Sequence, residues 1–385
     1  MYKRKKLILI IFCVFATISL IVFLRKDWIT DGQLTEVRQN EKVIGRSDRL
    51  SSIAIVVVIA NRAHIKRKYE TAQKSLQCYC ESRGLPYYLI VRDEWEIENA
   101  SRNTSCLMGD FMYQRHCILV DLMKKSRHEW FLMIDADMGV INPNQSFYNF
   151  LPKLNDKELF AVFSDRDYSS EIMAGTYLAR NNEKGKDFLM SWARSWNRYM
   201  GGENLDNGAL PVMILRKYLP HLEAETSKCE LWWKASRRHW CRYLLYVICT
   251  RILIDNHPIA GLKFLPKTRS YYRDGWLTGG KFSSEDFLLH GWKEPIKDKR
   301  TIFMGWMNAF SEEAFNDMNL CKSREQAHQL WRYKMGFQWS VEENRRELDA
   351  WIERSTRERR RLTEIALTFN VTQEDGCDRS LYEFQ

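Results

Sequence analysis

Apolar runs alternate with stretches of helical periodicity through the middle of the chain. The sequence SIAIVVVIA at residues 52–60 is a continuous run rich in β-branched side chains, which suits a strand buried on both faces of a parallel sheet. A helical stretch follows at 64–83, where Gly84 and Pro86 end it, and a second strand is expected at 87–91. This succession of strand, helix and strand predicts an α/β fold with a mainly parallel sheet.

The same alternation continues further along the chain. Residues 220–250 are rich in Trp and Arg and carry no pattern that assigns them, and the chain after about residue 311 is helical and charged. Short β or loop elements are expected at 261–266 and 287–292. The remaining expected elements are helices at 110–125, 183–199 and 207–218, and strands at 131–134, 159–165 and 176–180.

A long apolar segment lies close to the N-terminus. Residues 7–24 form an uncharged run of 18 residues, close to the ~20 that a helix needs to span hydrocarbon. Four basic residues precede the run and two follow it, so the positive-inside rule favours a cytoplasmic N-terminus and a luminal body. A cleaved signal peptide is the alternative, but its apolar core is typically only ~7–15 residues long. The sequence therefore favours an uncleaved single N-terminal membrane helix.

Length and composition allow one large domain or two. The 385 residues are 45% hydrophobic and 13% aromatic, which is enough for a sizeable core. We expect a cytoplasmic tail and transmembrane anchor at 1–26, a polar stem at 27–50, an α/β domain at 51–310 and a helical C-terminal extension at 311–385.

The positive charge of the chain does not point to a nucleic-acid partner. Of the formal net charge of +10, residues 1–26 carry six positives and no acids, which leaves about +4 for the rest. The basic excess therefore belongs mostly to the anchor and its topology. A late basic cluster in a charged, helical stretch is interpreted as a solvated helix face, and it comprises Arg354, Arg357, Arg359, Arg360 and Arg361.

Cysteines and glycosylation sequons bear on the compartment. Nine of the ten cysteines lie beyond the apolar segment, and an oxidising lumen permits disulfides. Their odd number leaves at least one thiol free or paired between chains, so a disulfide-linked oligomer is possible beside a non-covalent one. Cys78-Tyr79-Cys80 is too tight for a zinc knuckle. In a luminal body the Asn-x-Ser/Thr sequons become meaningful; they start at Asn99, Asn103, Asn144 and Asn370.

The segment EWFLMIDADMGVINP, residues 129–143, is an apolar strand that runs straight into two acids. In a strand, Asp135 and Asp137 would point to the same face, about 6.6 Å apart along the chain. Two carboxylates so placed repel unless a cation lies between them, and oxygen ligands suit Mn²⁺ or Mg²⁺. Ligands of α/β sheets bind at the carboxyl ends of strands. The alternative is a solvated turn in which either acid caps a backbone N–H.

A second motif, FLLHGWKEP, lies at residues 287–295. His290 could be a third metal ligand, Gly291 allows backbone to approach a phosphate closely, and Lys293 could neutralise a diphosphate. Taken alone, His290 is more often a structural histidine and Trp292 more often a core residue.

These features together resemble the GT-A glycosyltransferases. More narrowly, the chain is similar to the retaining α-galactosyl-, α-mannosyl- and xylosyltransferase family of the Golgi, and most closely to a nematode-expanded, uncharacterised family of type II membrane proteins. The resemblance covers about residues 50–300. It implies a Rossmann-like GT-A domain, Mn²⁺ (or Mg²⁺) held by Asp135, Asp137 and His290, and a nucleotide-diphosphate sugar as donor. Residues 291–293 (Gly291, Trp292 and Lys293) would then contact that donor.

Two stretches between these motifs resemble donor-sugar segments of that family. In SDRDYSSEIMAGTYLARN, residues 164–181, Asp165 and Gly175 would lie near the donor sugar. In ENLDNGALPVMIL, residues 203–215, Asp206 would lie beside the reacting sugar, although Leu205 stands where many relatives have Gln. Arg115 is a weaker candidate for a phosphate contact. The structural alternatives are a helix N-cap for Asp206, a turn for Asp165 and a surface ion pair for Arg115.

The resemblance implies a Golgi glycosyltransferase, and a hexosyltransferase in particular, that moves a hexose or pentose to a glycan or glycoprotein acceptor. Retention of configuration rests on the resemblance alone, because an inverting enzyme would also need a general base that no motif identifies. Two alternatives stay open. One is a catalytically silent protein of the same fold that binds a glycan or a partner. The other is a metal-dependent phosphoesterase, which usually needs ligands for two ions.

Overall fold

The computed structural model describes residues 53–99, 106, 109–197, 205–237, 239–267, 270–293, 309–311, 317–333 and 335–368. All of them belong to one compact unit within residues 47–385. The anchor expected at 1–26 and the stem at 27–50 lie outside the described residues. Among the residues that are described, no helix combines the length and the apolar character needed to cross a membrane.

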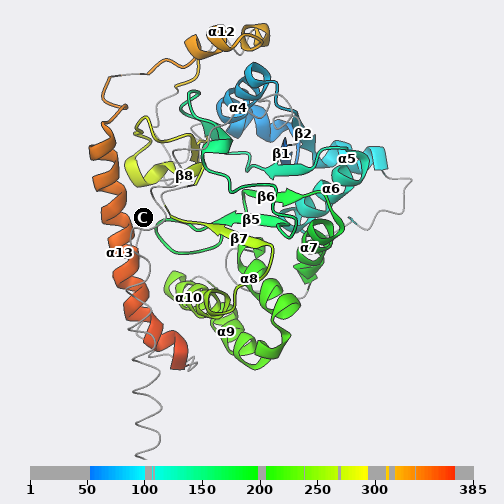
Figure 1. Cartoon of the computed structure of the whole chain (residues 1–385), viewed down its shortest axis with the longest axis vertical. Helices are drawn as coiled ribbons and strands as arrows, with labels where there is room; N and C mark the ends of the chain where they lie inside the picture. The colour runs from blue at the N-terminus through cyan, green and yellow to red at the C-terminus, as the bar shows by residue number, and fades with distance from the viewer. Residues whose placement is uncertain are drawn as a thin grey trace, which may run out of the picture. The chain divides into compact units, whose positions relative to one another are not determined.

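A six-stranded sheet forms the centre of the fold (Figure 1). Only β6 is antiparallel to its neighbours β3 and β5, so the expected mainly parallel sheet is confirmed. Strand β1 pairs in parallel with β2 on one side and β3 on the other. In spatial order the strands are β2 (Tyr87–Val91), β1 (Ile53–Ile59), β3 (Trp130–Met133), β6 (Tyr177–Arg180), β5 (Ala161–Ser164) and β7 (Leu262–Leu265).

Helices cover both faces of this sheet because the side chains of β1 alternate between two apolar clusters. Ile55 and Val57 pack with Leu76 of α4 (Glu70–Arg83) on one face. On the other face Val56 packs in one cluster with side chains of several helices. Among these helices are α5 (Arg92–Asn99), which follows β2, α6 (Phe111–Lys125), α7 (Glu183–Ala193) and α8 (Leu205–Tyr218).

The helix expected at 64–83 is present, but its first part is wound differently. A single turn, α3 (Arg62–His64), leads into a π-helical segment, η3 (Ile65–Tyr69), before α4 begins. Gly84 ends α4 in the left-handed conformation, with φ of 63°, which a glycine adopts without strain. Pi-helical turns are rare and often lie at functional sites.

A small three-stranded sheet lies beside the large one. Its strands are β4 (Met138–Val140), β9 (Leu288–His290) and β8 (Tyr272–Asp274), in that spatial order. Strand β9 is antiparallel to β4 and parallel to β8. Residues 287–292 were expected to form a short strand or a loop, and β9 shows that they include a strand. This strand pairs with β4, which directly follows Asp137.

The unassigned residues 220–250 form two helices, α9 (Glu223–Ala235) and α10 (Trp240–Asn256), which a Cys229–Cys249 disulfide connects. Eleven of the seventeen residues of α10 are buried, so it lacks the single apolar stripe by which a surface helix is recognised. A third apolar cluster joins these helices to α8 and to the C-terminal helix.

Among its described residues, the C-terminal part contains short helical elements followed by one long, charged helix. Helix α13 (Val341–Thr368) contacts α10 and the short turn η7 (Gly275–Thr278). Before it, η8 (Met318–Cys321) and α12 (Arg324–Gln329) pack against α4, to which a Cys78–Cys321 disulfide links them. The other short helical turns are η4 (Phe147–Asn149), η5 (Arg194–Asn197) and η6 (Pro220–Leu222).

Most cysteines in the described part of the chain are paired. Besides the two disulfides already named, Cys106 bonds Cys117, and Cys241 is disulfide-bonded as well. Cys80 on α4 is a buried free thiol, which agrees with the odd number of cysteines beyond the apolar segment.

Candidate metal centre

Two acids lie in the turn that connects β3 to β4. The Ile134 N–H still donates to Val56 O of β1 at 2.8 Å, and then the chain turns, with Met138 N–H donating to Asp135 O at 3.0 Å. The expectation that Asp135 and Asp137 share one face of a strand is therefore corrected. They lie beyond the last ladder bond of β3, and a turn, rather than strand periodicity, brings their carboxylates to one place.

The small sheet brings His290 to these acids. His290 ends β9 and is in register with Met138 of β4. Its ring Nε2 lies 3.4 Å from Asp137 Oδ1. One oxygen from each of Asp135 and Asp137 and one ring nitrogen of His290 all lie within 4.8 Å of one another. The structure thus brings His290 to two acids that precede it by more than 150 positions in the sequence.

The three residues after His290 take different positions around this group. Lys293 Nζ lies 3.1 Å from Asp137 Oδ2 and is the exposed positive charge beside it. Trp292 is 5% exposed and donates its backbone N–H to Asp137 O at 2.8 Å. A Cβ at Gly139 would lie 2.6 Å from the Trp292 ring, so the indole packs against bare backbone. Gly291 has φ of 92°, which glycine tolerates.

Arg115 of α6 supports Asp135 from the interior. It is 2% exposed, its Nη1 lies 3.3 Å from Asp135 Oδ1, and its Nη2 lies 2.6 Å from Asp206 Oδ2. Nη2 also donates to Ala174 O and Nε to Met112 O. The predicted phosphate contact of Arg115 stays a prediction, and these bonds favour a role in orienting Asp135.

Asp206, near the start of α8, contacts Arg115 and not Asp135 or Asp137. It is 2% exposed and accepts from both Arg115 and His116, whose Nε2 is 3.3 Å from Asp206 Oδ2. The His116 ring stacks on Trp192 at 3.6 Å between centroids, and its Nδ1 lies 2.8 Å from the Tyr177 hydroxyl. Asp206 is therefore connected to the acid pair through Arg115, and its predicted catalytic role is untested.

Asp165 belongs to a different group of charges. It follows β5, and its Oδ2 accepts from Arg251 of α10 at 3.1 Å. Burial raises the pKa of Asp165 to about 6, although Arg251 opposes the rise. Asp255 and Arg359 extend this group toward α13. None of these contacts includes the acid pair, so nothing here supports Asp165 beside a donor sugar, and its role stays a prediction.

Gly175 lies against Asp135, and its predicted place near the donor sugar stays a prediction. A Cβ at this position would be 2.3 Å from Asp135 Oδ2 and 2.6 Å from the Met173 methyl carbon. Only glycine therefore leaves the Asp135 carboxylate in its present position.

The charges of the three possible ligands act on one another. Burial raises the pKa of Asp135; Arg115 opposes that rise and Asp137 adds to it. Burial also opposes ionisation of Asp137, but His290 and Lys293 outweigh it and lower its pKa. Burial disfavours the charged form of His290, yet Asp137 and Asp274 raise its pKa. A bound cation would relieve the repulsion between the two carboxylates.

A family profile described as "Protein of unknown function, DUF273" matches residues 76–305, more than half of the chain. The chain belongs to this family. The matched region contains Asp135, Asp137 and His290, together with every other site residue named above except Arg359. No curated protein matches the chain.

Three solved structures are similar to the family member described here. One is a glycosyltransferase involved in the glycosylation of the major capsid of PBCV-1, at 12% identity and a TM-score of 0.36, covering 62% of this chain and 92% of that one. The apo form of the glycosyltransferase GlyE of Streptococcus pneumoniae TIGR4 has 20% identity and a TM-score of 0.30, covering 42% and 43%. A second GlyE structure has 17% identity and a TM-score of 0.29, covering 48% and 51%. The chain spans about half the length of GlyE or less.

Two residues beside the three possible ligands belong to no motif in the sequence. Asp274 ends β8, and its Oδ1 lies 2.6 Å from His290 Nδ1. Tyr69 ends the π-helical segment. Burial raises the pKa of its hydroxyl most, the charge of Asp137 adds to the rise, and the charge of Lys293 opposes it. The only sequence signal for Asp274 is an acid that follows Tyr271-Tyr272-Arg273 and precedes Gly275.

The residues present fit a divalent cation. Two carboxylates and one imidazole are an oxygen and nitrogen donor set that suits Mn²⁺ or Mg²⁺. The side chains of Asp135, Asp137 and His290 are 26%, 7% and 12% exposed, so the group is mostly enclosed but reachable through Asp135. Asp135 and Asp137 lie at the carboxyl end of β3, where ligands of such sheets bind.

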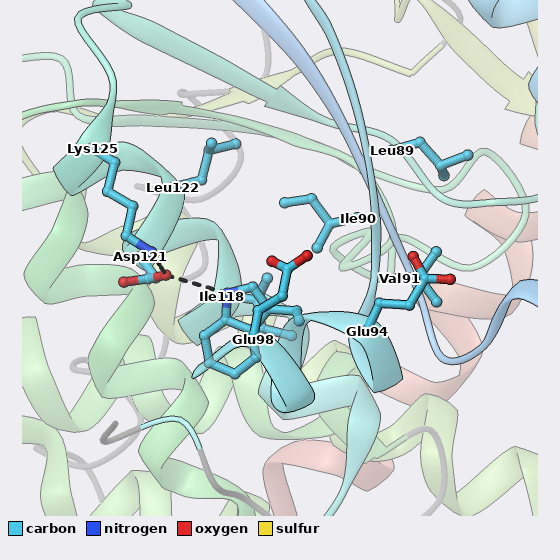
Figure 2. A pocket seen from close by; sticks show the side chains of 10 residues that line it. Leu89, Ile90, Val91, Glu94, Glu98, Ile118, Asp121, Leu122 and Lys125 are labelled. Atoms are coloured by element: carbon cyan, nitrogen blue, oxygen red, sulfur yellow. Dashed lines mark hydrogen bonds and ion pairs between the residues drawn. The ribbon is translucent and has the colours of Figure 1, made fainter. Parts of the chain in front are cut away.

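A separate cavity of about 240 Å³ lies over the edge strand β2 and between α5 and α6 (Figure 2). Leu89, Ile90 and Leu122 give it apolar walls, and Asp121 is paired with Lys125 at its rim. The cavity shares no lining residue with the metal group, and none of its residues forms a set of metal ligands.

Proposed function

We propose that the chain is a metal-dependent glycosyltransferase that uses a nucleotide-diphosphate sugar. The observation that carries the proposal is the meeting of Asp135, Asp137 and His290 at the carboxyl end of a parallel strand, with Lys293 beside them. A diphosphate needs a divalent cation and a further positive charge, and this arrangement offers both in one place.

Each residue has a distinct role in this proposal. Asp135, Asp137 and His290 would hold Mn²⁺ or Mg²⁺, which when bound supplies Lewis-acid stabilisation to a leaving diphosphate. Lys293 is 36% exposed and bonds Asp137 in its present position, from which it can turn to a phosphate oxygen. Arg115 orients Asp135 from the protein interior, and Gly175 leaves room for the Asp135 carboxylate.

The ligand set favours this chemistry over a two-metal phosphoesterase. Such enzymes hold two ions about 3.5–4 Å apart, which takes more acids or histidines than one triad. In the part of the chain that the structure describes, Asp135, Asp137 and His290 are the one set of three or more possible metal ligands. A single cation beside one lysine suits the departure of a diphosphate better than hydrolysis between two ions.

The finer parts of the proposal concern compartment and substrate. We place the protein in the Golgi membrane, with the body in the lumen. Support comes from the charge asymmetry around residues 7–24 and from disulfides such as Cys78–Cys321 and Cys229–Cys249, which persist in oxidising compartments. The transfer of a hexose or pentose with retention to a glycan or glycoprotein, and a link to the Golgi galactosyl-, mannosyl- and xylosyltransferases or their nematode relatives, rest on the sequence resemblance.

One observation favours a second candidate, a catalytically silent protein of the same fold. Asp206 and Asp165, the two acids put forward for the reacting sugar, are bound to Arg115 and Arg251 respectively. Asp206 is also 2% exposed. A chain whose buried acids are all engaged in this way could bind a nucleotide-sugar without turning it over.

A paired binding and turnover assay tests the proposal. The full chain, purified in detergent, is titrated with nucleoside diphosphates in the presence and absence of Mn²⁺, and nucleotide-sugars are followed for release of free sugar or transfer. We expect Mn²⁺-dependent binding and turnover in the wild type, and neither in the Asp135→Asn/Asp137→Asn double variant. Binding without turnover identifies the silent protein. Undiminished Mn²⁺-dependent binding by the double variant would sink the proposed site.

A further inference from the structure

We propose that Asp274 is a positioning residue that holds the His290 ring so that Nε2 faces the metal centre. This inference rests on the proposed function, because it gives Asp274 a task only if the group binds a cation. Asp274 itself does not belong to the group of possible ligands.

Strand pairing fixes the two residues relative to each other. β9 lies between β4 and β8, so His290 is in register with Met138 on one side and with Asp274 on the other. Both His290 and Asp274 are the last residues of their strands. The imidazole therefore lies between two acids that come from opposite neighbours, Asp137 directly before β4 and Asp274 at the end of β8.

The distances assign a different task to each ring nitrogen. Nδ1 lies 2.6 Å from Asp274 Oδ1, a strong hydrogen bond, whereas Nε2 lies 3.4 Å from Asp137 Oδ1. A carboxylate only accepts, so Nδ1 must carry the proton of the short bond. In the neutral ring the lone pair is then on Nε2, on the side of Asp137. Carboxylates that hold ligand histidines in this way tune metal affinity in many proteins.

The interior around Asp274 keeps this carboxylate in place. Asp274 is 2% exposed, and the positive charge of Arg166 acts on it. Arg166 is itself fixed, with Nη1 donating to the Tyr168 hydroxyl at 2.6 Å and Nε 3.4 Å from Glu171 Oε2. Asp274 is thus buried beside an arginine that has its own partners, Tyr168 and Glu171.

A neighbouring acid provides a matched control. Asp286 is buried, at 9% exposure, and it pairs with Arg273 at 2.5 and 3.0 Å. It also accepts from Ser283 N–H and Asn344, but no bond connects it to His290. Changing Asp286 removes a buried carboxylate near β8 and β9 without touching the ring.

The test is a double-mutant cycle on Mn²⁺ affinity, measured by calorimetry with the full chain. We expect Asp274→Asn to weaken Mn²⁺ binding by about 10–100-fold. The double variant Asp274→Asn/His290→Ala should bind no more weakly than His290→Ala alone, because Asp274 acts through the ring. Asp286→Asn should lower thermal stability and leave the affinity for Mn²⁺ unchanged.

A measurement on the wild type covers the case in which Asp274→Asn fails to fold. With a diamagnetic ion such as Zn²⁺ bound, the ¹⁵N signals of His290 should show a protonated, hydrogen-bonded Nδ1 and a metal-bound Nε2. A metal-bound Nδ1 overturns the inference, as does wild-type affinity in Asp274→Asn or losses that multiply in the double variant. In those cases the proposed function stands. A wild type that binds no divalent ion overturns both.

Discussion

At the scale of single residues, the cluster of Asp135, Asp137 and His290 depends on two glycines, Gly175 and Gly139, as well as on its charged neighbours. Asp135 is reached by Arg115 from the interior, and the bare backbone of Gly175 lies against its other oxygen. Trp292 covers Gly139 in the same manner. Because interiors are close-packed, one added methyl group at such a position must displace a neighbour.

Gly175→Ala should therefore impair the metal centre more than the fold. The new Cβ would lie 2.3 Å from Asp135 Oδ2, so the carboxylate has to move away from its place beside Asp137. We expect Mn²⁺ affinity, measured by calorimetry, to fall at least 10-fold. Gly84→Ala is the control, because its Cβ would meet nothing within 4 Å and only its φ of 63° is strained. It should lose about 1 kcal/mol of stability and no affinity. Equal affinities in Gly175→Ala and the wild type would contradict this role of Gly175.

The asparagines of the sequons differ in how exposed they are to a glycosylating enzyme. Asn144 is exposed in the turn after β4, whereas Asn99 is 6% exposed and its Nδ2 donates to Trp95 O at 2.7 Å. If the body is luminal, glycopeptide mapping of protein from a secretory host should find a glycan at Asn144 and none at Asn99. A glycan at Asn99, or an unmodified Asn144, would contradict the prediction. Asn103 and Asn370 lie outside the described residues.

At the scale of elements, the sequence predicted those strands and helix ends that depend only on neighbouring residues. The β-branched run of β1 and the Gly84 stop of α4 need only their own neighbours, and both elements lie where the sequence places them. The turn at Asp135 was only the alternative to a continued strand, because an apolar pattern does not show where the hydrogen bonds to the neighbouring strand end. Helix α10 was missed because burial on nearly all sides removes its periodicity.

The three possible metal ligands could be predicted from sequence motifs, but the residues that hydrogen-bond to them could not. Asp135, Asp137 and His290 each stand in a recognisable run of residues. The bond from Arg115 to Asp206 and the bond from Asp274 to His290 span 91 and 16 positions. Such pairings are products of the tertiary fold, and no spacing in the sequence marks them.

Helix α6 carries a buried histidine that should make stability depend on pH. Burial lowers the pKa of His116 to about 4, against the opposing bond to Asp206. Between pH 6.5 and 4 the unfolded chain takes up a proton at this histidine and the folded chain does not. The free energy of unfolding should therefore fall with pH across that window, by on the order of 3 kcal/mol.

Urea denaturation of the wild type and His116→Gln at pH 7 and pH 4.5 isolates this contribution. The wild type should lose more stability than the variant between the two pH values, because glutamine does not titrate. Parallel losses in the two proteins would show that His116 has an ordinary pKa in the folded state.

At the scale of the whole molecule, disulfides connect parts that are distant in the sequence. The Cys78–Cys321 bond spans 243 positions and fastens α4 to the segment before α13, whereas Cys106–Cys117 spans 11. Because helix α4 also supplies Gln73, whose side chain donates to Ala136 O at 2.7 Å in the metal turn, the long bond supports the site indirectly.

Removing the long-range disulfide should cost more stability than removing the short one. In the chain-entropy model a cross-link stabilises in proportion to the logarithm of the closed loop, which predicts a difference of about 2–3 kcal/mol. Chemical denaturation of Cys78→Ser/Cys321→Ser and Cys106→Ser/Cys117→Ser measures it. A larger loss from the short bond would contradict the entropic account.

The central claim, that Asp135, Asp137 and His290 hold one divalent cation, is tested most directly by crystals grown with Mn²⁺ and a nucleoside diphosphate. An anomalous difference map should show one Mn²⁺ peak between the three side chains, roughly 2.0–2.3 Å from an oxygen of each acid and from His290 Nε2. The diphosphate should bridge this ion and Lys293. An ordered Mn²⁺ elsewhere, or a bound diphosphate with no anomalous peak among these three residues, would contradict the account.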